Sequence, residues 1–221
     1  GTETVIEMSH KYDKRLLVMS TSEIYGKNTS DSLSEEDDRI LGSPLKSRWS
    51  YSEAKAIDEI LAYTYWREKG LETVIIRLFN TVGPRQTGSY GMVIPRFVGQ
   101  ALRNEPITVF GDGNQTRCFC HVGDVVEGLV ALSEHPEAFG KVFNLGGGEE
   151  VSIRELAERV IELAGSQSSL EFIPYDTAYE AGFEDMERRV PNTTRAMQLV
   201  GFEPSASLDD IIRSVIDDQQ A

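Results

Sequence analysis

Tyr51 and Lys55 are the two residues whose types and spacing most directly suggest chemistry. Residues four apart on a helix lie on the same face, so a helix here would bring the phenol and the ammonium together. An unperturbed tyrosine titrates near pH ~10, and a neighbouring positive charge favours the phenolate. The pair is therefore a candidate general base. Tyrosine and lysine at this spacing are also common on ordinary amphipathic helices, so the interpretation depends on the surrounding elements.

Two apolar segments, residues 15–20 and 73–80, have the character of buried strands. Polar side chains stand at or just after their ends: Thr21, Ser22 and Glu23 at the first, and Arg77, Asn80 and Arg85 at the second. Parallel strands deliver the residues at their carboxyl ends to one ligand-binding crevice. We therefore expect these side chains to converge with the Tyr51 helix at one site.

Strand-like and helix-like segments alternate along the chain. Further strands are expected at 107–111 and 117–122, and residues 141–148 are expected to form a strand followed by a glycine turn. An extended segment is expected at 170–175. Helices are expected at 51–69, 93–103, 152–164, 193–200 and 208–218, and another from an Asp124 N-cap to Leu132. This alternation predicts an α/β fold with a largely parallel sheet. The polar segment 27–47 is long for a loop within such a domain, which favours a role as a wall of the site.

Composition excludes several classes of protein. The chain has 221 residues, of which 40% are hydrophobic and 26% charged, as in a globular protein. The net charge of −14 argues against nucleic acid or an anionic membrane as a partner. No apolar run approaches the ~20 residues of a membrane span, and the first residues do not resemble a signal peptide, so a cytoplasmic location is expected. The two cysteines, Cys118 and Cys120, are expected to be buried thiols, and no metal site is expected.

Five segments, in order, carry a family resemblance: STSEIYG, RWSYSEAK, RLFNTVGPR, VFGDGNQTR and RRVPNTTRA. They resemble the extended short-chain dehydrogenase/reductase superfamily, and within it the branch of nucleotide-sugar epimerases, dehydratases and decarboxylases. The resemblance runs over essentially the whole chain. It implies an NAD cofactor, a UDP-sugar or similar nucleotide-sugar substrate, and a Rossmann-type doubly wound parallel sheet with a smaller α/β substrate lobe.

The resemblance also implies a division of the chain. Residues 1–84 and 117–146 would belong to the NAD-binding domain, and residues 85–116 and 147–221 to the nucleotide-sugar lobe. In this family the helix at 51–69 pairs with the helix before the STSE strand, here residues 2–12, to form a four-helix interface. A homodimer is therefore expected.

Individual roles follow from the matching positions. By resemblance, Tyr51 removes the proton from the sugar 4-hydroxyl, Lys55 holds the cofactor ribose and lowers the Tyr51 pKa, and Thr21 bridges Tyr51 and the sugar. Ser22 and Glu23 would assist catalysis, and Ser20 would line the cofactor site. The remaining matches are substrate-binding positions: Asn80, Arg96, Arg117 and Arg189.

One departure from the family concerns the cofactor. The family begins with a strand and a GxxGxxG loop that holds the dinucleotide pyrophosphate at a helix N-terminus. The sequence contains no such motif, and LGGGEE at 145–150 does not have its spacing. We therefore expect a truncated enzyme that holds NAD poorly by itself.

The residues after the STSE strand bear on the type of reaction. The 4,6-dehydratases usually carry aspartate where this chain has Ser22, which disfavours dehydration. The Thr-Ser-Glu order resembles UDP-glucuronate decarboxylases, whereas GSYGMVIPRF and GFEDMERRVP resemble the general bacterial sugar epimerases. The sequence narrowly favours a 4-epimerase acting on a UDP-hexose or UDP-hexuronate. A decarboxylase is the main alternative, and a non-catalytic sugar-nucleotide-binding fragment stays open.

Overall fold

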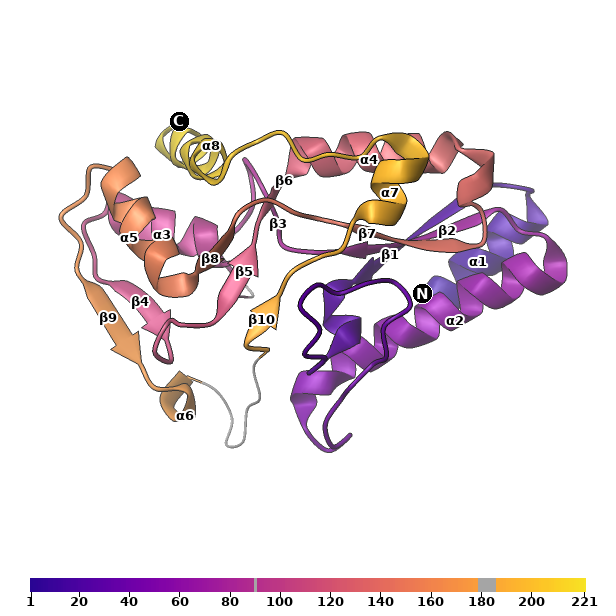
Figure 1. Cartoon of the computed structure of the whole chain (residues 1–221), viewed down its shortest axis with the longest axis horizontal. Coiled ribbons are helices and arrows are strands. Elements are labelled where there is room, and N and C mark those ends of the chain that lie inside the picture. The colour runs from indigo at the N-terminus through magenta and orange to yellow at the C-terminus, as the bar shows by residue number, and fades with distance from the viewer. Residues whose placement is uncertain (90, 179–185) are drawn as a thin grey trace.

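The computed structural model describes residues 1–89, 91–178 and 186–221. Two parts of the motifs quoted above lie outside these ranges: Tyr90 of GSYGMVIPRF and the first four residues of GFEDMERRVP. Figure 1 shows two lobes, a larger one with a parallel sheet between two layers of helices and a smaller one that has the C-terminal helix at its edge.

A three-stranded parallel sheet lies at the centre of the larger lobe. Its strands are β1 (Leu16–Thr21), β2 (Thr73–Leu78) and β7 (Lys141–Leu145), in the order β1-β2-β7. The middle strand β2 is buried along almost its whole length, as expected for a parallel strand covered on both faces. Thr21 pairs with Leu78 in register, so the polar residues that follow β1 and β2 emerge at the same edge.

Helices cover both faces of this sheet (Figure 1). Helices α1 (Thr2–Lys11) and α2 (Ser50–Lys69) lie on one face, and α4 (Val122–Glu134) and α7 (Thr194–Val200) on the other. The helix expected at 51–69 is confirmed, but its apolar residues are divided between two environments. Leu61 and Tyr65 pack against the core, whereas Ile57 and Ile60 are 57% and 61% exposed.

The smaller lobe has its own hydrophobic core. Helices α3 (Val93–Leu102), α5 (Ile153–Leu163) and α8 (Leu208–Gln220) pack around β4 (Ile107–Phe110), which pairs in parallel with β9 (Leu170–Ile173). Both α5 and α8 begin with a capping box, in which the N-cap serine and the acidic residue at N3 satisfy each other's backbone N–H groups. Polar residues in the sequence therefore set the start of these two helices. The short helix α6 (Tyr175–Ala178) follows β9.

Short strands connect the two lobes. Strand β5 (Thr116–Cys118) lies between β8 (Glu150–Ser152) and β10 (Arg188–Arg189), while β3 (Thr81–Val82) pairs with β6 (Cys120–His121). The single strand expected at 117–122 is therefore two strands. They separate at Phe119, whose ring packs into the core of the smaller lobe.

The expected N-cap at Asp124 is wrong. Helix α4 begins three residues earlier, because the His121 side chain caps it by accepting a hydrogen bond from the backbone N–H of Gly123. The Asp124 carboxylate instead accepts a hydrogen bond of 2.8 Å from the Ser205 hydroxyl. It thereby joins α4 to the segment that leads into α8.

None of the helices in the described ranges has the length and apolar character required to cross a membrane. Within the same ranges, acidic, histidine and cysteine side chains form no group of three or more that could hold a metal ion.

Candidate active site

The chain turns sharply where β1 ends. Thr21 caps the 3-10 helix η1 (Ser22–Tyr25), and its Oγ1 accepts a hydrogen bond of 3.2 Å from the Glu23 backbone N–H. Gly26 ends this turn with φ +60°, and a Cβ at this position would lie 2.3 Å from the carbonyl oxygen of Ile40. Glycine is therefore required here, and the turn presents Ser22 and Glu23 at the carboxyl edge of the sheet.

Glu23 lies between two arginines. Its Oε1 accepts a hydrogen bond of 2.6 Å from Arg189 Nη2, and its Oε2 forms an ion pair with Arg48 Nη1. Arg189 Nη1 also donates to the Ser22 hydroxyl over 3.3 Å. Burial raises the pKa of Glu23, but Arg189 and Arg48 together outweigh burial and hold the pKa below its ordinary value. Glu23 is therefore a carboxylate between two guanidinium groups.

Tyr51 and Lys55 lie in the first turns of α2, one turn apart, as the spacing predicts. The Tyr51 side chain is 51% exposed, so its hydroxyl is accessible to a ligand. Lys55 Nζ donates a hydrogen bond of 2.9 Å to the carbonyl oxygen of Met19 and lies 3.5 Å from a carboxylate oxygen of Asp58. The bond to Met19 ties the lysine to β1, two residues before Thr21.

Ser20 and Arg77 are directed into the protein. The Ser20 hydroxyl donates to Glu59 Oε1 over 2.5 Å, and Arg77 forms a two-pronged ion pair with the same carboxylate at 2.9 and 2.8 Å. Burial lowers the pKa of Arg77, but the bonds to Glu59 outweigh this and raise it. The expectation that Arg77 joins the crevice is therefore wrong, because a buried guanidinium needs a buried anion and Glu59 supplies it.

Three further candidate residues have local partners. Asn80 Nδ2 donates to the Cys118 carbonyl over 2.8 Å, which ties the end of β2 to the strands that connect the lobes. Arg117 is buried on β5, beside Arg189 in register, and donates to the carbonyl oxygens of Thr116 and Glu187. Arg96 lies in the smaller lobe, where it donates to Thr108 Oγ1 over 2.6 Å and stacks on the Phe110 ring. These contacts do not join Arg96 to Glu23.

Arg48 is the site residue that sequence reasoning did not assign. It belongs to the RWSYSEAK segment, three residues before Tyr51, and stands in η2 (Ser47–Trp49) immediately before α2. A cationic residue directly before a helix that carries a candidate base was the available signal. Nothing in the local sequence, however, indicates that its partner is Glu23.

The segment 27–47 packs beside the chain that carries Arg189. Leu33 donates from its backbone N–H to the Val190 carbonyl and accepts at its own carbonyl from the Asn192 N–H, both over 2.8 Å. The segment therefore adjoins the residue that follows Arg189, next to the predicted site.

Both cysteines are buried thiols, as expected. Burial raises the pKa of Cys118 to about 11 and that of Cys120 to about 12. Both thiols are therefore protonated at neutral pH.

Comparison with known proteins identifies the family. The model of the NAD-dependent epimerase/dehydratase family matches residues 1–146. A UDP-N-acetyl-alpha-D-glucosaminuronate decarboxylase of Bacillus cytotoxicus is 38% identical over 217 residues, which cover 98% of this chain and 67% of that protein. The UDP-glucuronic acid decarboxylase 1 of Arabidopsis thaliana is also 38% identical, over 99% of this chain and 48% of the plant protein.

Solved structures also resemble the chain. The crystal structure of UDP-glucuronic acid 4-epimerase from Bacillus cereus, in complex with UDP-glucuronic acid and NAD, superposes with a TM-score of 0.87 at 28% identity. The match covers 99% of this chain and 66% of that structure, so the chain spans about two thirds of the epimerase and about half of the plant relative. The Rossmann-like α/β fold and the resemblance seen in the sequence are confirmed, and the chain belongs to the NAD-dependent epimerase/dehydratase family.

Proposed function

We propose that the chain is the catalytic and sugar-binding part of an NAD-dependent UDP-hexuronate decarboxylase. The observation that carries this proposal is the arrangement of one carboxylate, Glu23, between the guanidinium groups of Arg48 and Arg189. The three side chains together bear a net charge of +1 and are largely buried. A site of this charge favours an anionic sugar over a neutral one.

An unused hydrogen-bond donor supports the same conclusion. Among the described residues, the Arg189 Nε–H is buried and has no acceptor. A buried donor without a partner is destabilising by ~1–3 kcal/mol, and a substrate carboxylate would satisfy it with a charge-assisted hydrogen bond. A hexose with a neutral 6-hydroxymethyl group would supply a weaker acceptor.

The residues present fit one end of NAD. The ammonium of Lys55 has three donors, of which Met19 and Asp58 engage two. Tyr51 and Lys55 would therefore hold the nicotinamide ribose, whereas the chain has no GxxGxxG loop for the pyrophosphate. When bound, NAD supplies a reversible hydride acceptor for the sugar C4.

The chemistry of a 4-keto uronate assigns a role to each residue. Tyr51 takes the proton of the 4-hydroxyl, and Thr21 orients that hydroxyl. In the 4-keto sugar the C5–C6 bond breaks, its electron pair forms an enolate over C5, C4 and the C4 oxygen, and C6 leaves as carbon dioxide. Arg189 and Arg48 position the substrate carboxylate, and Ser22 and Glu23 assist its loss. C5 of the enolate then takes up a proton from solvent. Asn80, Arg117 and Arg96 remain proposed ligands of the nucleotide diphosphate or sugar.

A second candidate is a 4-epimerase, which was the first choice from sequence. The superposed Bacillus cereus structure is named a UDP-glucuronic acid 4-epimerase, so an anionic sugar alone does not separate the two activities. Two observations favour the decarboxylase over the 4-epimerase. One is the Glu23–Arg189 ion pair, and the other is the identity of 38% to proteins named decarboxylases, compared with 28% to this epimerase.

The product mass tests the proposal directly. A full-length protein that contains residues 1–221 and binds NAD is incubated with UDP-glucuronate and UDP-N-acetylglucosaminuronate. We expect the mass spectrum to show a UDP-pentose product. Its mass should be lower than that of the substrate by one carbon dioxide, because a hydrogen replaces the carboxyl group on C5. Conversion to an isomer of unchanged mass would contradict the proposal and support the 4-epimerase.

Two structural proposals accompany this function. We propose the division at residues 84/85, 116/117 and 146/147 between NAD-binding and sugar-binding parts, which is supported by separate hydrophobic cores in the two lobes. Helix α7 is an exception, because it lies within 147–221 but packs on β7 and α4 in the core of the larger lobe. We also propose a homodimer formed through α1 and α2, which pack together and expose Val5, Met8, Ile57, Ile60 and Tyr63. A shallow hollow of about 310 Å³ lies along α1 and is lined by Val5 and Met8 among others.

The dimer predicts the effect of a charge on α2. Ile60→Asp is expected to raise the dimer dissociation constant about tenfold or more, because it buries an unpaired carboxylate in an apolar contact. Light scattering across a concentration series measures this. Val126→Asp on α4 is the matched control, since Val126 is 49% exposed on the opposite face of the sheet. A wild-type monomer at high concentration would refute the dimer.

A further inference from the structure

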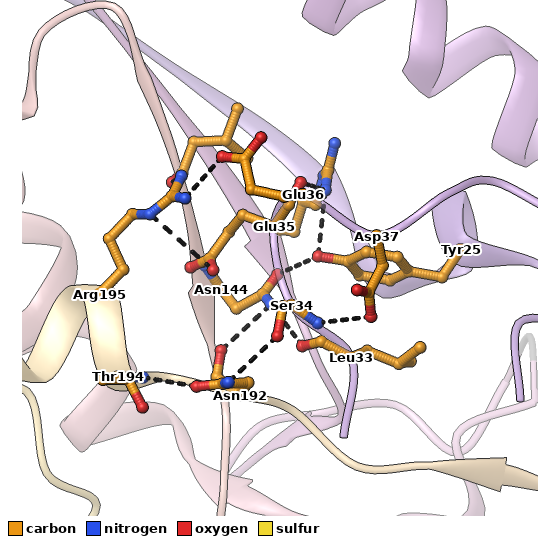
Figure 2. A network of polar contacts seen from close by, with 12 residues as sticks. Tyr25, Leu33, Ser34, Glu35, Glu36, Asp37, Asn144, Asn192, Thr194 and Arg195 are labelled. Carbon is orange, nitrogen blue, oxygen red and sulfur yellow. Dashed lines mark hydrogen bonds and ion pairs between the residues drawn. The ribbon is translucent and has the colours of Figure 1, made fainter. Parts of the chain in front are cut away.

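Asn144 lies at the centre of a buried polar network (Figure 2). It is 0% exposed, and its Oδ1 accepts a hydrogen bond of 2.7 Å from the Tyr25 hydroxyl. Its amide donates to the Leu33 carbonyl at 2.9 Å and to the Asn192 carbonyl at 3.2 Å, while its backbone N–H donates to Glu35 at 2.9 Å. Both amide hydrogens and the amide oxygen therefore have partners, as buried polar networks require.

The two segments that Asn144 contacts lie far apart in sequence and side by side in space. Leu33 and Pro191 form a parallel bridge, in which the backbone of Leu33 bonds both Val190 and Asn192. Asn192 Nδ2 also donates to the Ser34 hydroxyl over 3.0 Å, as Figure 2 shows. Because the Asn144 amide reaches one carbonyl on each segment, it binds the paired segments to strand β7.

Arg189 directly precedes the bridged residues. Its guanidinium reaches Glu23 and Ser22 on the other side of the site, so its backbone position decides whether the ion pair forms. The bridge to Leu33 holds that backbone at Val190, one residue away.

The same network extends to the helix that carries Tyr51. Arg77, the register partner of Asn144 on β2, donates to the Tyr25 hydroxyl at 3.0 Å and to the Glu35 carbonyl at 2.9 Å. It also holds Glu59 of α2. The helix that carries Tyr51 and the segment that carries Arg189 are therefore both tied to one set of buried hydrogen bonds.

We propose that Asn144 is a positioning residue: by holding residues 33 and 192 on β7, it places the Arg189 guanidinium against Glu23. Asn144 acts through the bridged segments, and its contacts lie among Tyr25, Leu33, Glu35 and Asn192. Its importance for turnover rests on the proposed function, but its effect on the Arg189–Glu23 pair exists without substrate or cofactor.

The test uses the 221-residue chain without ligands. The pKa of Glu23 is measured by carbon-detected NMR titration, with the signal assigned by its loss in Glu23→Gln. Asn144→Ala is expected to raise this pKa, in the same direction as Arg189→Ala and by no more than that variant. Amide hydrogen exchange at Leu33 and Asn192 is expected to rise about tenfold or more, while exchange at Val74–Leu78 of β2 is unchanged.

Asn114→Ala is the matched control. Asn114 has an equally polar side chain, but its contacts are to Asp112 within an exposed turn of the smaller lobe. It should leave both measurements unchanged. An unchanged Glu23 pKa in folded Asn144→Ala would overturn the proposal.

Ser34→Ala provides a second test of the positioning role if Asn144→Ala does not fold. It removes the acceptor of Asn192 Nδ2 and keeps the backbone bonds. A smaller rise in the same two quantities supports the proposal, and no change in either contradicts it. Failure of the proposed function would appear separately, as the wrong product mass with the Glu23 pKa still dependent on Asn144.

Discussion

Replacing Tyr51 with phenylalanine is expected to lower turnover of an NAD-binding full-length protein about 100-fold or more. The variant keeps the ring and removes the oxygen that takes the proton from the sugar 4-hydroxyl. Tyr51 is half exposed at the start of α2, so the substitution leaves no buried cavity. Binding of the nucleotide sugar should change much less than turnover.

The control for this variant is Tyr63→Phe. It removes the same hydroxyl group from the same helix, at a position 42% exposed and three turns farther along. Stopped-flow absorbance of reduced NAD measures the oxidation at C4 directly. Near-normal rates in pure Tyr51→Phe protein would refute the assignment of Tyr51 as the base.

Glu23→Gln is expected to lower carbon dioxide release about 100-fold or more, while oxidation at C4 continues. Glutamine has the same size but carries no charge. It also leaves Arg48 and Arg189 without the carboxylate that neutralises them. The 4-keto sugar and reduced NAD should therefore accumulate, and mass spectrometry and absorbance detect them.

Glu68→Gln provides the matched control, because Glu68 is an exposed carboxylate on α2 that pairs with Arg67. It should leave carbon dioxide release unchanged. If Glu23→Gln has little effect on a protein that interconverts the two 4-epimers, the epimerase is the correct assignment. If Glu23→Gln abolishes oxidation at C4 as well, its role lies earlier in the reaction than proposed.

Most elements of the fold follow from local sequence. The apolar segments at 15–20 and 73–80 and the helical period at 51–69 correspond to β1, β2 and α2, because these patterns depend on neighbouring residues. The interruption at 117–122 does not follow from local pattern. Phe119 leaves the strand because the core of the smaller lobe takes up its ring, and that core is assembled from α3, α5 and α8.

The orientation of α2 is a second feature that the local sequence pattern does not predict. Its sequence predicts a helix with bulky apolar residues, which are usually buried. In the structure the sheet side of the helix is lined by Ser52, Ala56, Glu59 and Ala62. Small residues allow close packing on β1 and β2, and Glu59 is buried because Arg77 on β2 neutralises it. That partner is 18 residues away in sequence, so periodicity alone does not reveal it.

By itself, the sequence determined the Tyr51–Lys55 pair and the polar residues after β1, because these depend on spacing within one element. It also determined the family to which the chain belongs, because five short segments follow one another in the family's order. Only the tertiary structure decided how the charged residues pair. Arg189 forms an ion pair with Glu23, 166 positions earlier in the sequence, and Arg48 pairs with the same carboxylate. Arg77 pairs instead with Glu59 inside the protein. The physical reason is that a buried charge is stable only beside its counter-charge, and burial and proximity are properties of the folded chain.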